Sequence, residues 1–264
     1  MMTRTLSLAL LLGTSLFAAC AADGTSDSTT PGDDELAGEN GADGEKADAN
    51  ALQDTFGIYM AQKVGAFECN GAGSCTHVDL VRAGRSTTTC ADGSSKASCE
   101  VRGLDFTKLN LSSSKLNDVT KKLQASAATP EIGPQLLLRG KYVHGSNPLN
   151  PGVDWITFQV TELWVAQIPD GVTDGSLVMI RDNGIRCIEA PCPSLNEARL
   201  NSTRTMNIHG IDWPTGLASS IQDKIYTATT KPDGVIVAGD RSHGTILHQP
   251  TNLRTVNQAF VNVK

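Results

Sequence analysis

The run WITFQVTELWV at residues 155–165 decides the fold class of this chain. Apolar and polar side chains alternate along most of it, which is the pattern of a strand with one buried face. Its β-branched and aromatic residues pack well on a pleated surface. Working outward along the chain, similar but shorter patterns predict strands at residues 56–60, 99–106, 136–145, 177–180, 207–213, 235–244 and 256–261.

Two short helices complete the expected pattern. The first covers residues 112–124, and serines 112–114 are available to cap its N-terminus. The side chains that would share one helix face are Leu116, Val119 and Leu123 in the first helix and Leu217, Ile221 and Ile225 in the second. We therefore predict an α+β fold that is mostly antiparallel sheet, with two short helices and disulfide bonds.

The order of these patterns occurs twice along the chain. Residues 207–213 match residues 100–106 position by position, and residues 235–244 repeat a glycine and a His-Gly pair of residues 136–145. Blocks that recur in the same order indicate an internal repeat. We predict a single globular domain at 51–264, built from two pseudo-repeats at about 54–167 and 175–264. The alternative is two independent domains.

The N-terminus is typical of an export signal at residues 1–19. Arg4 precedes an apolar run at residues 6–18 that is short for a membrane span. The residues FAAC at 17–20 resemble a bacterial lipobox, which implies a lipid on Cys20 and a lipid-anchored protein of the cell envelope. Ala21, in place of an aspartate, favours the outer membrane, with the domain facing the periplasm or the cell surface. The alternative is ordinary signal cleavage that leaves Cys20 as an odd thiol.

Residues 20–50 are expected to be the lipidated cysteine followed by a disordered acidic linker. Nine of the chain's carboxylates lie here with one Lys46, and Leu36 is the only large apolar residue. An acidic cation-binding tract is the alternative. Because residues 51–264 are close to neutral, charge gives no reason to expect a nucleic-acid partner.

Without Cys20, the chain has an even set of six cysteines. An exported protein meets oxidising conditions, so we expect disulfides rather than free thiols. The simplest of the fifteen possible pairings joins neighbours: Cys69 with Cys75, Cys90 with Cys99, and Cys187 with Cys192. A zinc site made by the first four cysteines is the alternative, although their spacings are wider than usual for zinc.

The run GIRCIEAPCPS at residues 184–194 is a candidate binding loop. A disulfide and two prolines would preorganise it and so lower the entropy cost of recognition. Its candidate contact residues are Arg186, Ile188, Glu189 and Pro191. In the competing interpretation, Ser194 and Glu197 form a capping box for a short helix, and the disulfide tucks the loop down.

The sequence contains no catalytic motif, and we expect neither a cofactor nor a metal. His144 and His243, each before a glycine, are interpreted as turn residues, with a paired site as the alternative. Asp105 and Asp212 are interpreted as caps, with a carboxylate pair as the alternative. We expect a non-enzymatic interaction or structural module with an unknown protein or envelope ligand. Protease-inhibitor-like binding through the 187–192 loop is the first alternative, and a hydrolase is the second.

Two stretches resemble a known bacterial secreted family, domain-of-unknown-function family 6748. The first is TTCADG at residues 88–93 with Cys99 and LDF at 104–106. The second is RDNGIRC at 181–187 through APCPSL at 190–195, with LNS at 200–202. The resemblance covers about residues 54–264. It implies an extracytoplasmic location and a shared fold, but no activity, because the family is uncharacterised.

Overall fold

The computed structural model describes residues 57–68, 74–147 and 150–263. The predicted export signal, lipid attachment site and acidic linker lie outside these residues, so they stay predictions. Cys69 lies outside them as well, so its predicted disulfide also stays a prediction.

Most of the chain forms one large sheet of eleven strands. Its strands are β1 (Ile58–Glu68), β2 (Ser74–Arg82), β5 (Cys99–Val101), β6 (Leu104–Asp105), β7 (Leu136–Asn147), β8 (Asn150–Ala166), β9 (Ser176–Asp182), β10 (Leu195–Arg199), β11 (Thr205–Ile208), β13 (Val235–Gly239) and β16 (Gln258–Asn262). Apart from β6, which pairs in parallel with β8, neighbouring strands are antiparallel. The predicted mostly antiparallel α+β fold is confirmed.

Smaller elements surround this sheet. A second sheet has the order β12-β15-β14, and a short hairpin pairs β3 with β4. The bounds are β3 (Thr88–Thr89), β4 (Ser95–Lys96), β12 (Gly210–Asp212), β14 (Arg241–Ile246), β15 (Gln249–Thr255), α2 (Ser113–Ala128) and α3 (Ser219–Thr229), with short 3-10 helices at Thr107–Leu109 and Pro130–Ile132. Ser112 caps α2 as expected, whereas Leu217 precedes α3 instead of lying in it.

The middle of the large sheet is the antiparallel pair of β8 and β16. Val165 lies opposite Val261, and the flanking pairs are Trp164 with Asn262 and Ala166 with Phe260. Outward from β8 the order is β7, β1, β2, β5, and outward from β16 it is β13, β9, β10, β11. The strand order is therefore mirrored about this pair. The internal repeat stays a prediction.

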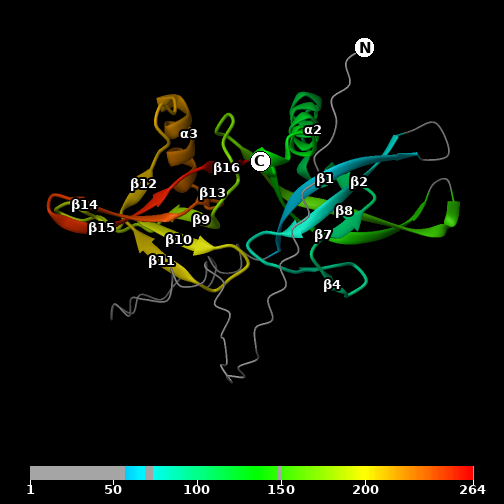
Figure 1. Ribbon diagram of the computed structural model, residues 1–264, viewed down its shortest axis with the longest axis horizontal. Coiled ribbons are helices and arrows are strands. Elements are labelled where there is room, and N and C mark those ends of the chain that lie inside the picture. The colour runs from blue at the N-terminus through cyan, green and yellow to red at the C-terminus, as the bar shows by residue number, and fades with distance from the viewer. Residues whose placement is uncertain (1–56, 69–73, 148–149, 264) are drawn as a thin grey trace, which may run out of the picture.

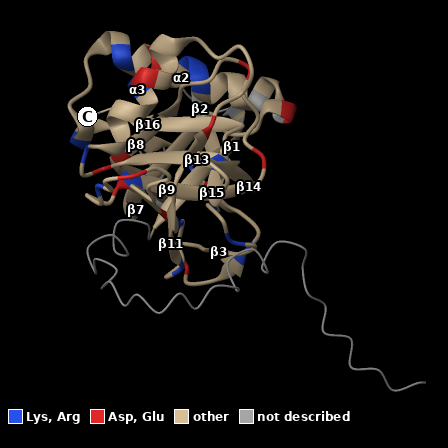
Figure 2. Ribbon diagram, turned by 90° about the vertical axis from the view of Figure 1, so that its left-hand side faces the viewer, with Lys and Arg blue, Asp and Glu red and all other residues tan. Residues whose placement is uncertain are grey.

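Alternate side chains of a strand point to opposite faces of the sheet. In the central strands both sets of side chains are largely apolar, so both faces are apolar. On one face, two clusters pack against the helices, one with Val119 and Leu123 of α2 and the other with Ile225 and Ala228 of α3. Both helices therefore lie on the same side of the sheet (Figures 1 and 2). A third cluster on the opposite face combines residues of both halves: Ile58, Ala83, Leu137, Trp164, Ala166, Leu177, Met179, Leu200, Ile236, Ala238 and Phe260.

Asn201, which is fully buried, also joins the two halves through its side-chain hydrogen bonds. Its side-chain oxygen accepts from the backbone N–H of Gly57 at 2.6 Å. Its amide nitrogen donates to the carbonyls of Ile58 at 2.9 Å and Ala83 at 2.8 Å. Asn201 itself has φ 54°, a left-handed conformation that asparagine tolerates better than most residues. One side chain at the end of β10 therefore fixes the start of β1 and the end of β2.

The single strand predicted at residues 235–244 is wrong, because β13 ends at Gly239 and β14 begins in another sheet. At Gly239 the backbone passes so close to β15 that a Cβ would lie 1.9 Å from the Thr255 carbonyl oxygen. The glycines that follow the two histidines, Gly145 and Gly244, lie inside β7 and β14 and do not have a positive φ. His144 and His243 are therefore strand residues rather than turn residues.

The second half contains a buried ion network where the first half is aromatic. Glu197 on β10 accepts from Nε of Arg254 at 2.9 Å and from Nη2 of Arg241 at 2.5 Å, and all three residues are buried. Arg241 and Arg254 lie opposite each other across β14 and β15. In the first half, the facing residues across β7 and β8 are Tyr142 and Phe158, whose ring centroids are 5.4 Å apart.

This difference predicts unequal outcomes for two kinds of substitution. Glu197→Gln leaves two buried guanidinium groups without their counter-ion, so we expect it to lower the free energy of unfolding by about 3–5 kcal/mol. The triple change Glu197→Leu, Arg241→Tyr and Arg254→Phe supplies the kinds of side chain found in the first half. We expect it to cost less, about 1–3 kcal/mol, because no buried charge loses its partner and only the Gly239 carbonyl, which accepts from Arg254 at 3.0 Å, is left unpaired. Urea unfolding measures both, and an unchanged midpoint for Glu197→Gln would contradict the prediction.

Candidate binding loop

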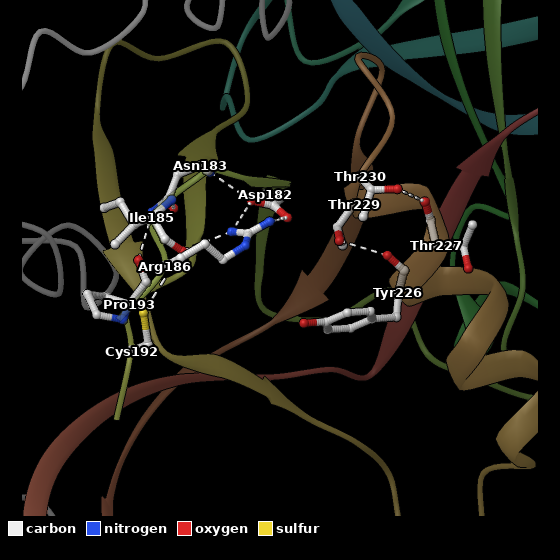
Figure 3. Close-up of polar contacts among 11 residues, drawn as sticks. Asp182, Asn183, Ile185, Arg186, Cys192, Pro193, Tyr226, Thr227, Thr229 and Thr230 are labelled. Atoms are coloured by element: carbon white, nitrogen blue, oxygen red, sulfur yellow. Dashed lines mark hydrogen bonds and ion pairs between the residues drawn. The ribbon is translucent and has the colours of Figure 1, made fainter. Parts of the chain in front are cut away.

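The candidate loop connects β9 to β10, which pair directly at its base through Asp182 and Leu195. The N–H of Asn183 donates to the carbonyl of Ser194 at 3.0 Å, and its side-chain amide donates to the carbonyl of Pro193 at 2.7 Å. The Asn183 oxygen accepts from the N–H of Ile185 at 2.9 Å. Asn183 therefore closes the loop at its base (Figure 3).

The disulfide between Cys187 and Cys192 gives the loop a compact shape. Its two Cα atoms are 5.5 Å apart, whereas an extended segment with the same five steps would span about 17 Å. The intervening residues 188–190 form bends. The tip of the loop is therefore a tight convex turn rather than an extended strand.

The structure places the four predicted contact residues at this tip. The side chain of Ile188 is fully exposed. Arg186 and Glu189 are exposed as well, and Pro191 is half-buried. The interpretation with a capping box and a tucked loop is wrong, because Leu195–Arg199 is strand β10 and Glu197 belongs to the buried ion network.

A second anchor holds the exposed Arg186. Its Nη1 donates to Oδ1 of Asp182 at 3.0 Å, and its Nη2 donates to Oδ2 at 2.7 Å (Figure 3). Asp182 also accepts from the N–H of Gly184 at 2.7 Å. The hydrogen bond from Arg186 has the largest effect on Asp182 and, with that from Gly184, holds the pKa of Asp182 below its ordinary value. The hydrogen bond to Asp182 in turn raises the pKa of Arg186. Tyr226, half-exposed on α3, lies close enough to add to the latter effect.

The anchors Asp182 and Asn183 are not among the predicted loop residues. A sequence signal for them was present, because the residues DNG at 182–184 favour a turn that is held by Asx side chains. An acid four residues before Arg186 was a further hint.

The remaining cysteines are only partly described. Cys90 and Cys99 form the predicted disulfide, with Cα atoms 5.3 Å apart. This bond rules out a zinc site that uses all four of the first cysteines. Cys69 lies outside the described residues, so its pairing with Cys75 stays a prediction. Within the described ranges, no cluster of three or more His, Cys, Asp or Glu side chains could hold a metal.

The paired polar residues of the two halves are not brought together. Asp105 on β6 accepts from the N–H of Thr107 at 2.9 Å, as expected for a cap, and its pKa is lowered mainly by Thr107. Asp212 is in the separate three-stranded sheet. His144 lies opposite Ile156 in the first half, whereas His243 contacts Asn252 in the second.

The Asp182–Arg186 contact predicts a measurable pKa change. In Arg186→Met the carboxylate loses its largest stabilising hydrogen bond, so the pKa of Asp182 should rise toward the ordinary value of about 3.9. Because this pKa is depressed in the folded protein, its contribution to stability is present above pH 4 or so and is lost as the pH falls through the folded-state pKa. NMR titration of carboxyl carbons measures the change. The pKa of Asp92, lowered mainly by Ser94, should not move, and a fixed Asp182 pKa would contradict the prediction.

The sequence of the chain matches one known family of domains. The part of the chain that the structure describes contains no helix both long and apolar enough to cross a membrane. No curated protein and no solved structure is significantly similar to the chain. The family model for a domain of unknown function, DUF6748, matches residues 72–263, which is most of the chain. This match confirms the expected resemblance, and the chain belongs to the DUF6748 family.

Proposed function

We propose that this chain is a lipid-anchored protein of the cell envelope that binds a partner without catalysis, through the loop at residues 184–192. Export, lipid attachment at Cys20 and the outer membrane are supported by the residues of the N-terminus alone. The predicted linker at 20–50 would separate the domain from the membrane surface.

One observation carries the binding proposal: Ile188, a large apolar side chain, is fully exposed at the tip of a loop with a fixed base. Burying an isoleucine side chain stabilises a contact by about 1.5–3 kcal/mol. The disulfide, the Asn183 hydrogen bonds and the Arg186–Asp182 pair already restrain the loop. Binding would therefore cost little additional conformational entropy.

The flanking charges would add specificity. Arg186 and Glu189 lie on either side of Ile188 in the sequence, and both are exposed. Such a pattern suits a partner with an apolar depression that is bordered by polar groups of both signs.

Protease inhibition through the same loop has weaker support. An inhibitor that occupies a protease cleft as a substrate does presents an extended segment, and the Cα separation of 5.5 Å excludes this for residues 187–192. A blocking mode that does not imitate substrate stays open to test with a panel of endopeptidases. Inhibition that is lost in Arg186→Ala or Glu189→Ala would favour it over partner binding.

Site-specific crosslinking tests the binding proposal. A photoreactive residue at position 188, in the full-length protein in native envelopes, should give one dominant crosslinked partner. The same residue at position 247 is the matched control, because Leu247 is another exposed apolar side chain on a different hairpin. With the purified partner, Ile188→Asp should weaken binding by about 10-fold or more. Equal yields at both positions, or unchanged affinity in Ile188→Asp, would refute the proposal.

The anchor has its own test. Labelled fatty acid should be incorporated into the wild-type protein but not into Cys20→Ser, and the variant should move from the membrane to the soluble extracytoplasmic fraction. Incorporation of the label into Cys20→Ser would overturn the lipid assignment without affecting the binding proposal.

A further inference from the structure

A small polar pocket lies on the face of the large sheet opposite the helices. Its walls come from β7, β8 and β9 and from the residues before β13: Arg139, Glu162, Trp164, Met179, Arg181 and Asp233. Trp164 and Met179 belong to the apolar cluster shared by both halves. The pocket therefore borders the middle of the sheet, apart from the loop at residues 184–192.

Hydrogen-bond donors in this pocket lack acceptors. Trp164 is 1% exposed, and its Nε1 has no hydrogen-bond partner among the described residues. The same holds for Nε and Nη2 of Arg139, both of which are buried. A buried donor left unpaired costs about 1–3 kcal/mol, so three of them in one place require an explanation.

The orientation of Arg139 accounts for which donors remain. Its Nη1 is used by Glu162, with N···O distances of 3.2 and 3.3 Å. Its Cζ lies 5.5 Å from the centroid of the Trp164 ring, a cation–π contact that holds the guanidinium plane in place. The unpaired edge contains Nε and Nη2, two parallel donors of the kind that bind a carboxylate in a bidentate manner.

We propose that this pocket binds a single carboxylate group, which accepts from Nε and Nη2 of Arg139 and from Nε1 of Trp164. Arg181, in the same pocket, adds a second positive charge. The carboxylates of Glu162 and Asp233 balance the two guanidinium charges, so the hydrogen bonds hold one small monoanionic group and the binding is weak. The carboxylate belongs to a small free acid or to the terminus of a peptide.

Trp164 allows binding to be measured directly in the full chain. In a Trp155→Phe/Trp213→Phe background, Trp164 is the only tryptophan. Acetate, titrated against chloride at constant ionic strength, should change its emission in a saturable way. Acetamide, which has the same shape but no charge, should not.

Variants with opposite expected effects separate binding from folding. Arg139→Met should weaken acetate binding by about 10-fold or more, because it removes the bidentate donor. Glu162→Gln should strengthen binding several-fold, because it removes a like charge beside the site. Arg102→Met is the matched control, since Arg102 has an ion pair of the same 3.2 Å length with Glu100 outside the pocket. This control should leave the affinity unchanged.

Two outcomes would overturn the proposal. One is equal responses to acetate and acetamide. The other is equal affinities in Arg139→Met, Glu162→Gln and the control variant. The affinities of a tripeptide with a free terminal carboxylate and of its amide identify which kind of molecule carries the carboxylate. Binding of the free form about 10-fold tighter than acetate assigns a peptide terminus, and equal affinity assigns a small free acid.

Discussion

The structure depends on the contact between β8 and β16. Three residue pairs, centred on Val165 and Val261, join a group of six strands and a group of five into one sheet. Because the sheet is continuous there, side chains from both groups can form the shared apolar cluster around Trp164 and Phe260. Without this contact, β8 and β16 would each become an exposed sheet edge, and each half would expose its part of that cluster. Asn201 adds a second link between the two halves, away from β8 and β16, through buried hydrogen bonds to the carbonyls of Ile58 and Ala83.

The two sides of this contact then differ in the side chains that pack between their paired strands. In the first half, β7 and β8 form a long continuous hairpin around Tyr59, Tyr142 and Phe158, whose rings meet edge to face. In the second half, the hairpin divides at Gly239 and its outer part turns into a separate sheet. Arg254 bridges this break, because it donates both to Glu197 and to the carbonyl of Gly239 at 3.0 Å. The ion network therefore satisfies a backbone group that the division of the strand would leave unpaired, which an aromatic side chain does not do.

Sequence reasoning recovered the fold class because most strands show a strong local pattern. The run at 155–165 and the valine-rich run at 235–239 are examples, and the helix at residues 113–128 even has its predicted cap. Strand β10 was missed because one of its buried positions is Glu197, whose charge is compensated by arginines more than forty residues away. The division at Gly239 was missed for a similar reason, since it depends on close approach to Thr255. Local patterns cannot reveal either tertiary contact.

The candidate loop was predictable from its own residues, and the residues DNG at 182–184 were a signal for its anchors, but the pocket was not predictable. Cysteine and proline spacing marked the loop at 184–194, whereas the pocket combines β7, β8 and β9 with residues from a turn. The end of β9 explains how one strand serves both features. Successive side chains point to opposite faces, so Arg181 contributes to the pocket while Asp182 holds Arg186 on the side of α3. A change in backbone position at these two residues would alter both features at once.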